Sequence, residues 1–336
     1  TFTGTVTGVT ANLNAVTAIN NGSIAGFRNR IINGGMNIDQ RNAGASQTIT
    51  AGAALAYTVD RWYAYCTGAN VTGQRVTNTG VTNALAQYAY QFTGAASVTA
   101  ISFAQRIEAV NCFDLAGTTA TLSVNLANSS LTTVSWAAYY ANTTDTFGTV
   151  ASPSVTSIAS GSFTVTSTLT RYSTSISIPS AATTGIQIVF SVGAQLATTT
   201  WTIGDVQLES GGTASVFERH PITVDLALCQ RYFQKSYGDT EKVGTVIGAG
   251  AQHITFIGPS SLVGGTLSFP TRMRASPTAT VYDGAGTAGA VSYFTSSWNN
   301  GGSYTALNPS YFGVYLQVNI SGAAYVNFDF SANAEL

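Results

Sequence analysis

Short stretches in which apolar and polar residues alternate make up most of this chain of 336 residues. Between Ser46 and Glu209 they are separated by turns rich in Gly, Asn and Ser, and helical spacing is rare. Alternation places the apolar side chains on one face of a strand, and a second sheet must cover that face. About nine or ten such strands predict a β-sandwich or jelly roll. Examples are YTVDRWYAY (57–65), AISFAQRIEA (100–109), TATLSVNLAN (119–128) and TTWTIGDVQLE (199–209).

One segment has helical spacing instead. In PITVDLALCQRYFQK (221–235) the residues Leu226, Cys229 and Phe233 fall on one helix face. Alternation resumes after Gly244, where about six strands predict a second, smaller β-domain. The sequence therefore predicts an all-β chain with four parts: an N-terminal segment (1–26), a jelly-roll β-sandwich (27–219), a short linker helix (220–240) and a C-terminal β-domain (241–336).

The N-terminal segment carries no charge and has its larger apolar residues four, three, four and three positions apart. Glycines and β-branched residues make it a poor isolated helix, and a lone strand would leave its edge bare. We therefore expect it to be stable only against a neighbour. The residues that would be buried there are Phe2, Val6, Val9, Leu13, Val16 and Ile19.

Charged residues make up only 8% of the chain, against a usual figure of about 25%. The net charge is −1 and the charges are scattered, which argues against a nucleic-acid partner. No apolar run is long enough to insert into a membrane, and no signal-peptide pattern is present. The odd set Cys66, Cys112 and Cys229 favours free buried thiols made in a reducing cytosol, with a Cys66–Cys112 disulfide as the alternative.

Asp60, Arg61 and Trp62 stand together in a segment that is otherwise almost free of charge. Trp62 could be a platform for a sugar ring or a core residue. In the second case the neighbouring charges need buried partners. The candidate partners are Arg41, Glu108 and Glu209.

Two further pairs of charged residues could carry chemistry. Arg106 and Glu108 share a strand face, and an ion pair between them is favoured over an acid/base pair. Asp205 and Glu209 near the end of the sandwich are a weak candidate for a Ca²⁺ site, because too few other oxygen ligands are evident. We therefore predict no metal site.

Catalytic patterns are missing from the sequence. His220 and His253 lie in no Ser-His-Asp or zinc arrangement, and the glycine-rich turn after Asp283 has no phosphate-loop Lys. The acidic residues are dispersed, although Asp239 or Asp283 would be tested if glycan cleavage were found. We therefore predict that the protein is not an enzyme and needs no cofactor.

The stretch SYFTSSWNNGGSYTALNPSYFGVY (292–315) mixes aromatic residues with Ser, Asn and Gly, as recognition loops do. SSWNNGGSY within it is expected to be a loop that exposes two of the aromatic side chains. The candidate receptor-binding or glycan-binding residues are Trp298, Tyr304, Tyr293 and Tyr311. The alternative is that these rings pack in the domain core or in a subunit interface.

Several stretches resemble bacteriophage tail fibre and tail-associated proteins that carry a jelly-roll module. They are NRIINGGMNIDQR, YTVDRWYAY, WTIGDVQLESGGTASVFERHP, LCQRYFQKSY with FPTRMRASPTATVYD, and the ending FDFSANAEL. The resemblance covers roughly residues 28–336, and the sandwich is also similar, in a general way, to carbohydrate-binding jelly rolls. It implies a virion protein, assembled in the bacterial cytoplasm as a homotrimer, whose N-terminal segments wind together and join other tail proteins.

The function that this resemblance implies is binding of a host surface glycan or lipopolysaccharide without catalysis. One alternative is a purely structural virion fibre, either associated with the tail adaptor or on the capsid. A second alternative is a secreted carbohydrate-binding module, against which the odd number of cysteines argues.

Overall fold

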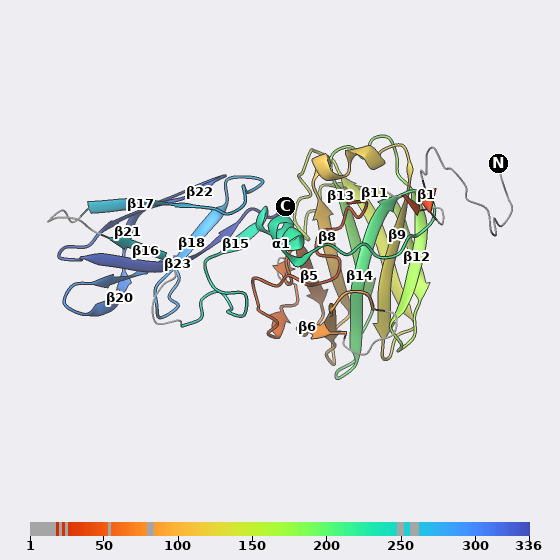
Figure 1. Cartoon of the computed structure of the whole chain (residues 1–336). Coiled ribbons are helices and arrows are strands. Elements are labelled where there is room, and N and C mark those ends of the chain that lie inside the picture. Colours follow the sequence, from red (N-terminus) through yellow and green to blue (C-terminus); the bar gives the residue numbers. More distant parts are fainter. Residues whose placement is uncertain are drawn as a thin grey trace, which may run out of the picture.

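The computed structural model describes residues 18–19, 22–23, 26–52, 55–78, 84–246, 252–255 and 262–336. Two β-rich bodies lie end to end with helix α1 (Ile222–Gln230) between them (Figure 1). The larger body is a sandwich around one apolar core, and the smaller body has a separate core. This confirms the predicted all-β sandwich followed by a short helix and a smaller β-domain. Within the described ranges, no helix combines the length and hydropathy needed to cross a bilayer.

The sandwich consists of two six-stranded antiparallel sheets. The first sheet has the order β11-β10-β13-β8-β5-β4, and the second has the order β12-β9-β14-β7-β6-β3. The first contains β4 (Ala56–Tyr57), β5 (Trp62–Thr67), β8 (Ala100–Ile107), β10 (Thr133–Ala141), β11 (Val155–Thr164) and β13 (Ile186–Val192). The second contains β3 (Gln47–Ile49), β6 (Val71–Thr77), β7 (Tyr88–Thr93), β9 (Thr119–Asn128), β12 (Thr170–Ser177) and β14 (Thr200–Ser210). Two 3-10 turns, η1 (Ala109–Asn111) and η2 (Phe113–Leu115), connect β8 to β9.

Aromatic rings fill the space between the two sheets. Trp62 and Tyr90 both stack on Phe103, with ring centroids 4.7 and 5.1 Å apart, and Phe92 stacks on Trp201 at 5.1 Å. All five rings are buried. Each contributes roughly 1.5–3 kcal/mol by leaving water. Trp62 is therefore a core residue and cannot serve as a sugar platform.

The stretch 57–65 is not one strand, contrary to the expectation from its alternation. β4 ends at Tyr57, and a turn with Arg61 at a φ of 72° leads into β5. Asp60 in this turn accepts a hydrogen bond from the Gln40 backbone N–H at 2.9 Å and lies 3.9 Å from Arg41. The pairing of Asp60 with Arg41 agrees with one of the predicted alternatives. The Thr58 N–H donates to the Trp62 carbonyl at 2.8 Å and closes the turn, and the Asp60 N–H donates to the distant Ile38 carbonyl at 3.1 Å, which local alternation could not reveal.

The smaller body is organised around its last strand. β15 and β18 pair with the C-terminal half of β23, and β16 and β19 pair with its N-terminal half. β20 pairs with β19, and β17-β22-β21 form a separate three-stranded sheet. The strands are β15 (Phe233–Lys235), β16 (Gln252–Thr255), β17 (Leu262–Ser268), β18 (Thr278–Tyr282), β19 (Val291–Phe294), β20 (Trp298–Gly302), β21 (Tyr304–Ser310), β22 (Gly313–Asn319) and β23 (Tyr325–Asn333).

Helix α1 is shorter than the sequence predicts. It ends at Gln230, and Phe233, expected on its apolar face, begins β15 instead. The backbone of β15 pairs with Ser331–Asn333 of β23. The helix stops because the sheet offers these residues hydrogen bonds to a distant strand. Cys229 is buried as expected, whereas Leu226 is only half-buried.

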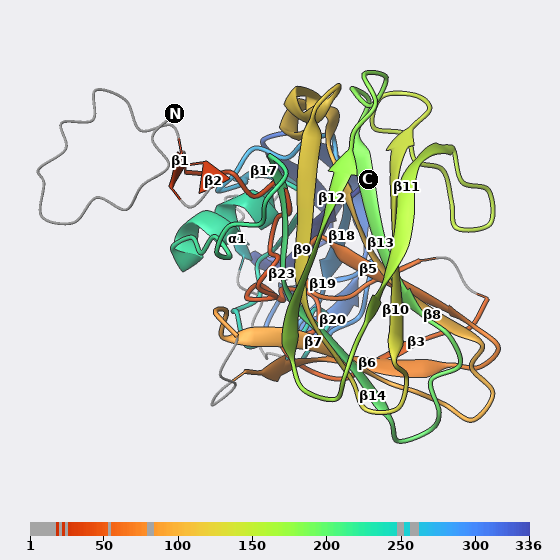
Figure 2. The same ribbon diagram turned by 90° about the vertical axis from the view of Figure 1, so that its right-hand side faces the viewer.

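The N-terminal segment contributes the two-stranded ribbon β1 (Ala18–Ile19) and β2 (Gly22–Ser23). In the view along the long axis of the molecule, this ribbon and α1 lie on the same side (Figure 2). The predicted trimer contacts fall outside the described residues, as does the side chain of Ile19. The other positions concerned are Phe2, Val6, Val9, Leu13 and Val16.

Residues 30–34, which follow the ribbon, form backbone hydrogen bonds with β14 of the second sheet. β14 has a bulge at Asp205, where φ is 47°. Beyond the bulge, the Arg30 N–H donates to the Leu208 carbonyl at 2.8 Å, and the Val206 N–H donates to the Gly34 carbonyl at 3.0 Å. A Cβ at Gly34 would lie 2.1 Å from the Val206 carbonyl oxygen. Only glycine allows this close approach.

Buried ionic contacts join the two bodies at the last residues of the chain. Glu335 pairs with Arg61, and Arg41 lies 3.3 Å from the same carboxylate. Arg106 donates to the Leu336 carbonyl at 2.6 Å. Arg61 and Glu335 are each less than 5% exposed. An isolated buried charge is costly, so these contacts hold the smaller body in one position on the sandwich.

Glu108 provides a second ionic link, and its partner differs from the prediction. It does not pair with Arg106. Instead Arg231 donates to its two oxygens at 2.9 and 3.1 Å, and the Tyr232 hydroxyl donates at 2.8 Å. Burial raises the pKa of the Glu108 carboxyl, but the hydrogen bonds from Arg231 and Tyr232 outweigh it and lower the pKa below its usual value. Glu108 and Arg106 point to different partners because β8 ends between them.

We expect Glu108→Gln to lower the free energy of unfolding by about 2 kcal/mol at neutral pH, because a charged acceptor is lost. A carboxyl with a lowered pKa contributes stability above its unfolded pKa and loses it as the pH falls. The difference between wild type and variant should therefore be constant above about pH 5 and shrink below 4.5. Urea denaturation followed by circular dichroism measures both values.

The matched control is Asp114→Asn, which removes an exposed partner of Arg30. It should change the free energy of unfolding by less than about 1 kcal/mol. A difference between wild type and Glu108→Gln that grows towards low pH would contradict the assignment.

Candidate functional site

A groove of about 170 Å³ opens on the outer face of the first sheet. Tyr63 and Tyr65 of β5 and Tyr139 of β10 contribute aromatic walls, and Arg106 of β8 and Gln187 of β13 lie between them. Arg106, Gln187 and Tyr139 are neighbours in register across three strands. We call these five residues the tyrosine groove.

Small side chains separate the aromatic residues. In the row of the sheet that starts at Tyr65, the paired residues on the next three strands are Ser102, Ser191 and Ser135. Residues paired in this way share one face of the sheet. In this row, the three residues next to Tyr65 therefore all carry small hydroxyl side chains. This row starts at the groove, whose lining also includes the apolar residues Phe147, Val155 and Val189.

The polar groups at the base of the tyrosine groove are held in place. Arg106 donates from Nε to Gln187 Oε1 at 3.2 Å and from Nη2 to the Gly148 carbonyl at 2.9 Å. Its guanidinium also lies 5.1 Å from the centre of the Tyr63 ring. Burial raises the pKa of Tyr63 to about 12, so this hydroxyl is neutral at physiological pH. The groove can therefore stack a flat polar ring against tyrosine and offer it fixed hydrogen-bonding groups.

Of the five groove residues, only Arg106 stood out in the sequence, and there as half of an ion pair. Trp62, whose side chain faces the core, was the candidate sugar platform rather than Tyr63 and Tyr65 beside it. Two tyrosines two positions apart share a strand face, and that is the signal that could have been used. Tyr139 could not have been added from the sequence, because only the order of strands β5-β8-β13-β10 brings it near.

The predicted recognition stretch forms strands rather than a loop. Trp298 begins β20, because residues 298–302 pair with β19. Its side chain is 49% exposed. It makes an edge contact with Phe294 at 5.5 Å, and Phe294 in turn contacts Tyr325 at 5.9 Å. These three rings cluster at the end of the smaller body that is farther from the sandwich, and we call them the tip cluster.

The other three candidates are not gathered beside Trp298. Tyr293 and Tyr304 are half-buried and pack against the core of the smaller body. Tyr311 lies in the turn between β21 and β22, where Arg272 stands 5.3 Å from its ring. The stretch 292–315 therefore contributes to several surfaces, and a binding role for these residues stays a prediction.

The two carboxylates considered for Ca²⁺ face hydrogen-bond donors. Asp205 accepts from the backbone N–H groups of Leu85 and Ala86 at 2.8 and 3.0 Å. Glu209 accepts from the Ser215 N–H at 2.8 Å and lies 3.3 Å from Arg28. Burial raises the pKa of Asp205, and the backbone hydrogen bonds oppose that effect. The described residues include no group of three or more His, Cys, Asp or Glu that could hold a metal.

The remaining reactive residues have structural partners. The three cysteines are buried free thiols, so no Cys66–Cys112 disulfide forms. Asp283 accepts from backbone N–H groups of its own turn, and Asp239 lines a separate hollow beside α1. His220 Nδ1 lies 3.0 Å from Asp225, and the side chain of His253 lies outside the described residues.

No protein-family model and no curated protein sequence matches this chain. Among solved structures it is similar to the enzymatically active domain of tailspike protein 4 from bacteriophage CBA120, with 17% identity over 58% of this chain and 23% of that chain. It is also similar to the carbohydrate-binding module TmCBM61 in complex with β-1,4-galactotriose, with 16% identity over 55% and 99% of the two chains. A CBM4 structure matches with 16% identity over 53% and 97%. The TM-scores are 0.36, 0.33 and 0.32, so the fold assignment rests on the strands and registers described above.

Exposure of Trp298 can be tested by fluorescence. The other three tryptophans, Trp62, Trp136 and Trp201, are buried. We expect acrylamide to quench chiefly Trp298, so Trp298→Phe should remove most of the quenchable emission. Since the side chain is half in solvent, this variant should unfold within about 1 kcal/mol of wild type. Unchanged quenching in Trp298→Phe would place this side chain in the interior.

Proposed function

We propose that this chain is a receptor-binding component of a bacteriophage tail fibre that binds a glycan of the bacterial surface. The observation that carries the proposal is the tyrosine groove, with its aromatic walls and its fixed polar base. Sugar rings have an apolar face that stacks on tyrosine and hydroxyl groups that need hydrogen-bonding partners. The groove supplies both kinds of contact within a volume below that of a drug-sized pocket.

Binding without turnover fits the lining of the groove. The described residues around it include tyrosines, Arg106, Gln187 and aliphatic side chains but no carboxylate. Glycoside hydrolysis usually needs two carboxyl groups on opposite sides of the scissile bond. We therefore propose a binding site rather than an active site.

The fibre role is supported by the sequence resemblance over residues 28–336 and by the uncharged N-terminal segment. We propose that three copies join through this segment, which also connects them to other tail proteins of the virion. A shallow groove holds one glycan weakly, and several linked copies raise the avidity by orders of magnitude.

The proposal predicts that Tyr65→Ala and Tyr139→Ala each weaken glycan binding by at least about tenfold, because a stacking surface is lost. Tyr65→Phe keeps the ring and should bind nearly as wild type. The measurement is titration of the full chain with purified bacterial lipopolysaccharides and capsular polysaccharides, immobilised as an array.

The variant Trp298→Ala tests which of the two surfaces, the tyrosine groove or the tip cluster, binds the glycan. If binding survives both tyrosine substitutions and is lost in Trp298→Ala, the glycan lies on the tip cluster and the groove assignment is wrong. If the wild-type chain binds no surface polysaccharide, the proposed function itself fails.

The groove also predicts weak salt dependence. Arg106 already donates to three acceptors, and the described lining carries no other charge. Affinity for a neutral glycan should therefore change by less than about twofold between about 50 and 500 mM NaCl. A steep loss would indicate that charge attraction provides the binding energy.

A further inference from the structure

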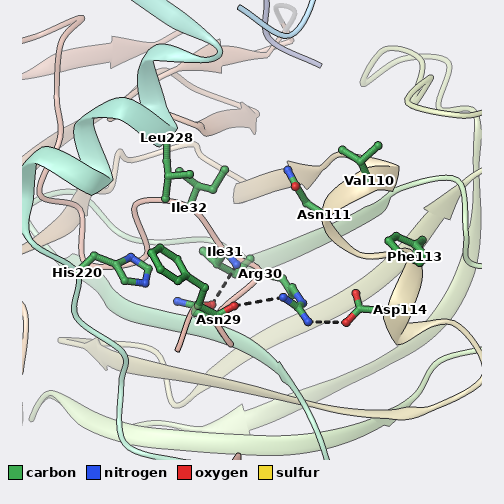
Figure 3. Close-up of a pocket in the computed structure, with 11 residues that line it drawn as sticks. Asn29, Arg30, Ile31, Ile32, Val110, Asn111, Phe113, Asp114, His220 and Leu228 are labelled. Carbon is green, nitrogen blue, oxygen red and sulfur yellow. Dashed lines mark hydrogen bonds and ion pairs between the residues drawn. The ribbon is translucent and has the colours of Figure 1, made fainter. Parts of the chain in front are cut away.

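An apolar surface surrounds the point where the N-terminal segment joins the sandwich. Phe27, Val110 and Phe113 are each at least 60% exposed and surround a hollow of about 430 Å³. Figure 3 shows Val110 and Phe113 on one side of this hollow and Ile32 and Leu228 on the other. Isolated exposed apolar residues are ordinary, whereas three around one cavity indicate a binding surface.

The surface continues along α1 to the smaller body. Leu228 also lines a second hollow, of about 460 Å³, whose far side is formed by Arg272. The Arg272 guanidinium stands 5.4 Å from the ring of Phe312, which is 65% exposed. We call this surface the α1 face. It is defined by Phe27, Val110, Phe113, Leu228, Arg272 and Phe312.

Charges on and beside the α1 face are mostly neutralised. Arg30 donates to Asp114 at 2.5 Å across the first hollow (Figure 3), and Arg231 beside the second is paired with Glu108. Interface cores are poor in unpaired charge and rich in aromatic residues and Arg. The α1 face has this composition, and hydrated glycans or nucleic acids would not need so apolar a surface.

The course of the chain indicates what covers this face. The sequence predicts that residues 1–26 are stable only against a neighbour, and we proposed above that copies join through them. From Ile19 to Phe27 the chain can span at most about 30 Å. If the joined segments share an axis through residue 19, Phe27 of each copy lies within about 30 Å of that axis. Figure 2 shows the β1–β2 ribbon and α1 on one side of the molecule, so that side faces the axis.

We infer that the α1 face is the surface on which a second copy of this chain docks. The inference rests on the proposed association of the N-terminal segments and is independent of glycan binding. The neighbouring copy covers Phe27, Val110 and Phe113 and extends along α1 to Phe312. Contacts between the folded bodies then add to those of the N-terminal segments.

The first test measures the mass of the full chain by light scattering across a dilution series. In the variant Val110→Asp with Phe113→Asp, the dissociation constant should rise by at least about tenfold per substitution, because buried apolar contacts become charges. The control is Leu196→Asp, a 59% exposed leucine in a loop away from α1, which should leave the mass unchanged. If the double variant keeps the wild-type mass at every concentration, or if the wild-type chain is a monomer, the inference is wrong.

A second test does not depend on the charged variants folding well. A polarity-sensitive dye is attached to Val110→Cys, since the three native cysteines are buried. Dilution should shift its emission to the red as the second copy leaves, and the same dye on Leu196→Cys should show no shift. Emission that stays blue in samples whose mass by light scattering is that of the monomer would mean that the chain's own N-terminal segment covers the face, which overturns the inference. Glycan binding by the same samples tests the proposed function separately.

Discussion

The contact between Glu335 and Arg61 is the constraint on which the arrangement of the two bodies depends. Both side chains are buried, so removing one would leave the other as an uncompensated charge in a medium of low polarity. The Arg61 guanidinium also lies 3.4 Å from the centre of the Tyr232 ring, which belongs to the segment between α1 and β15. One side chain thus touches both the residues that follow the last strand and the connection that precedes the smaller body.

The same junction brings the tyrosine groove and the end of the chain together. Arg106 donates to Leu336 on one side and to Gln187 at the base of the groove on the other. The Tyr57 hydroxyl donates to the same Leu336 carbonyl at 3.0 Å. Docking of the smaller body therefore orients a polar residue of the groove. The tyrosine groove and the domain arrangement are physically connected because they share one arginine.

Some of the few charged residues meet at the junction between the two bodies. Arg41, Arg61 and Arg106 all contact the last two residues there. The adhesion proposed above would act through stacking and hydrogen bonds, which salt screens little. Exposed apolar residues occur on the α1 face and also elsewhere on the sandwich, for example at Leu85, Leu196 and Val216.

The fold class follows from the sequence alone, because alternation with period two can bury an apolar face only by sheet packing. The sequence also located the helix, the buried thiols and the exposure of Trp298. It could not determine that Phe233 leaves the helix, that Arg61 turns the chain, or that Glu108 pairs with Arg231. Each of these depends on a partner far away in the sequence, and alternation carries no information about which strands become neighbours. The tyrosine groove exists only in the folded sheet, because strand order alone places Tyr139 beside Tyr63 and Tyr65.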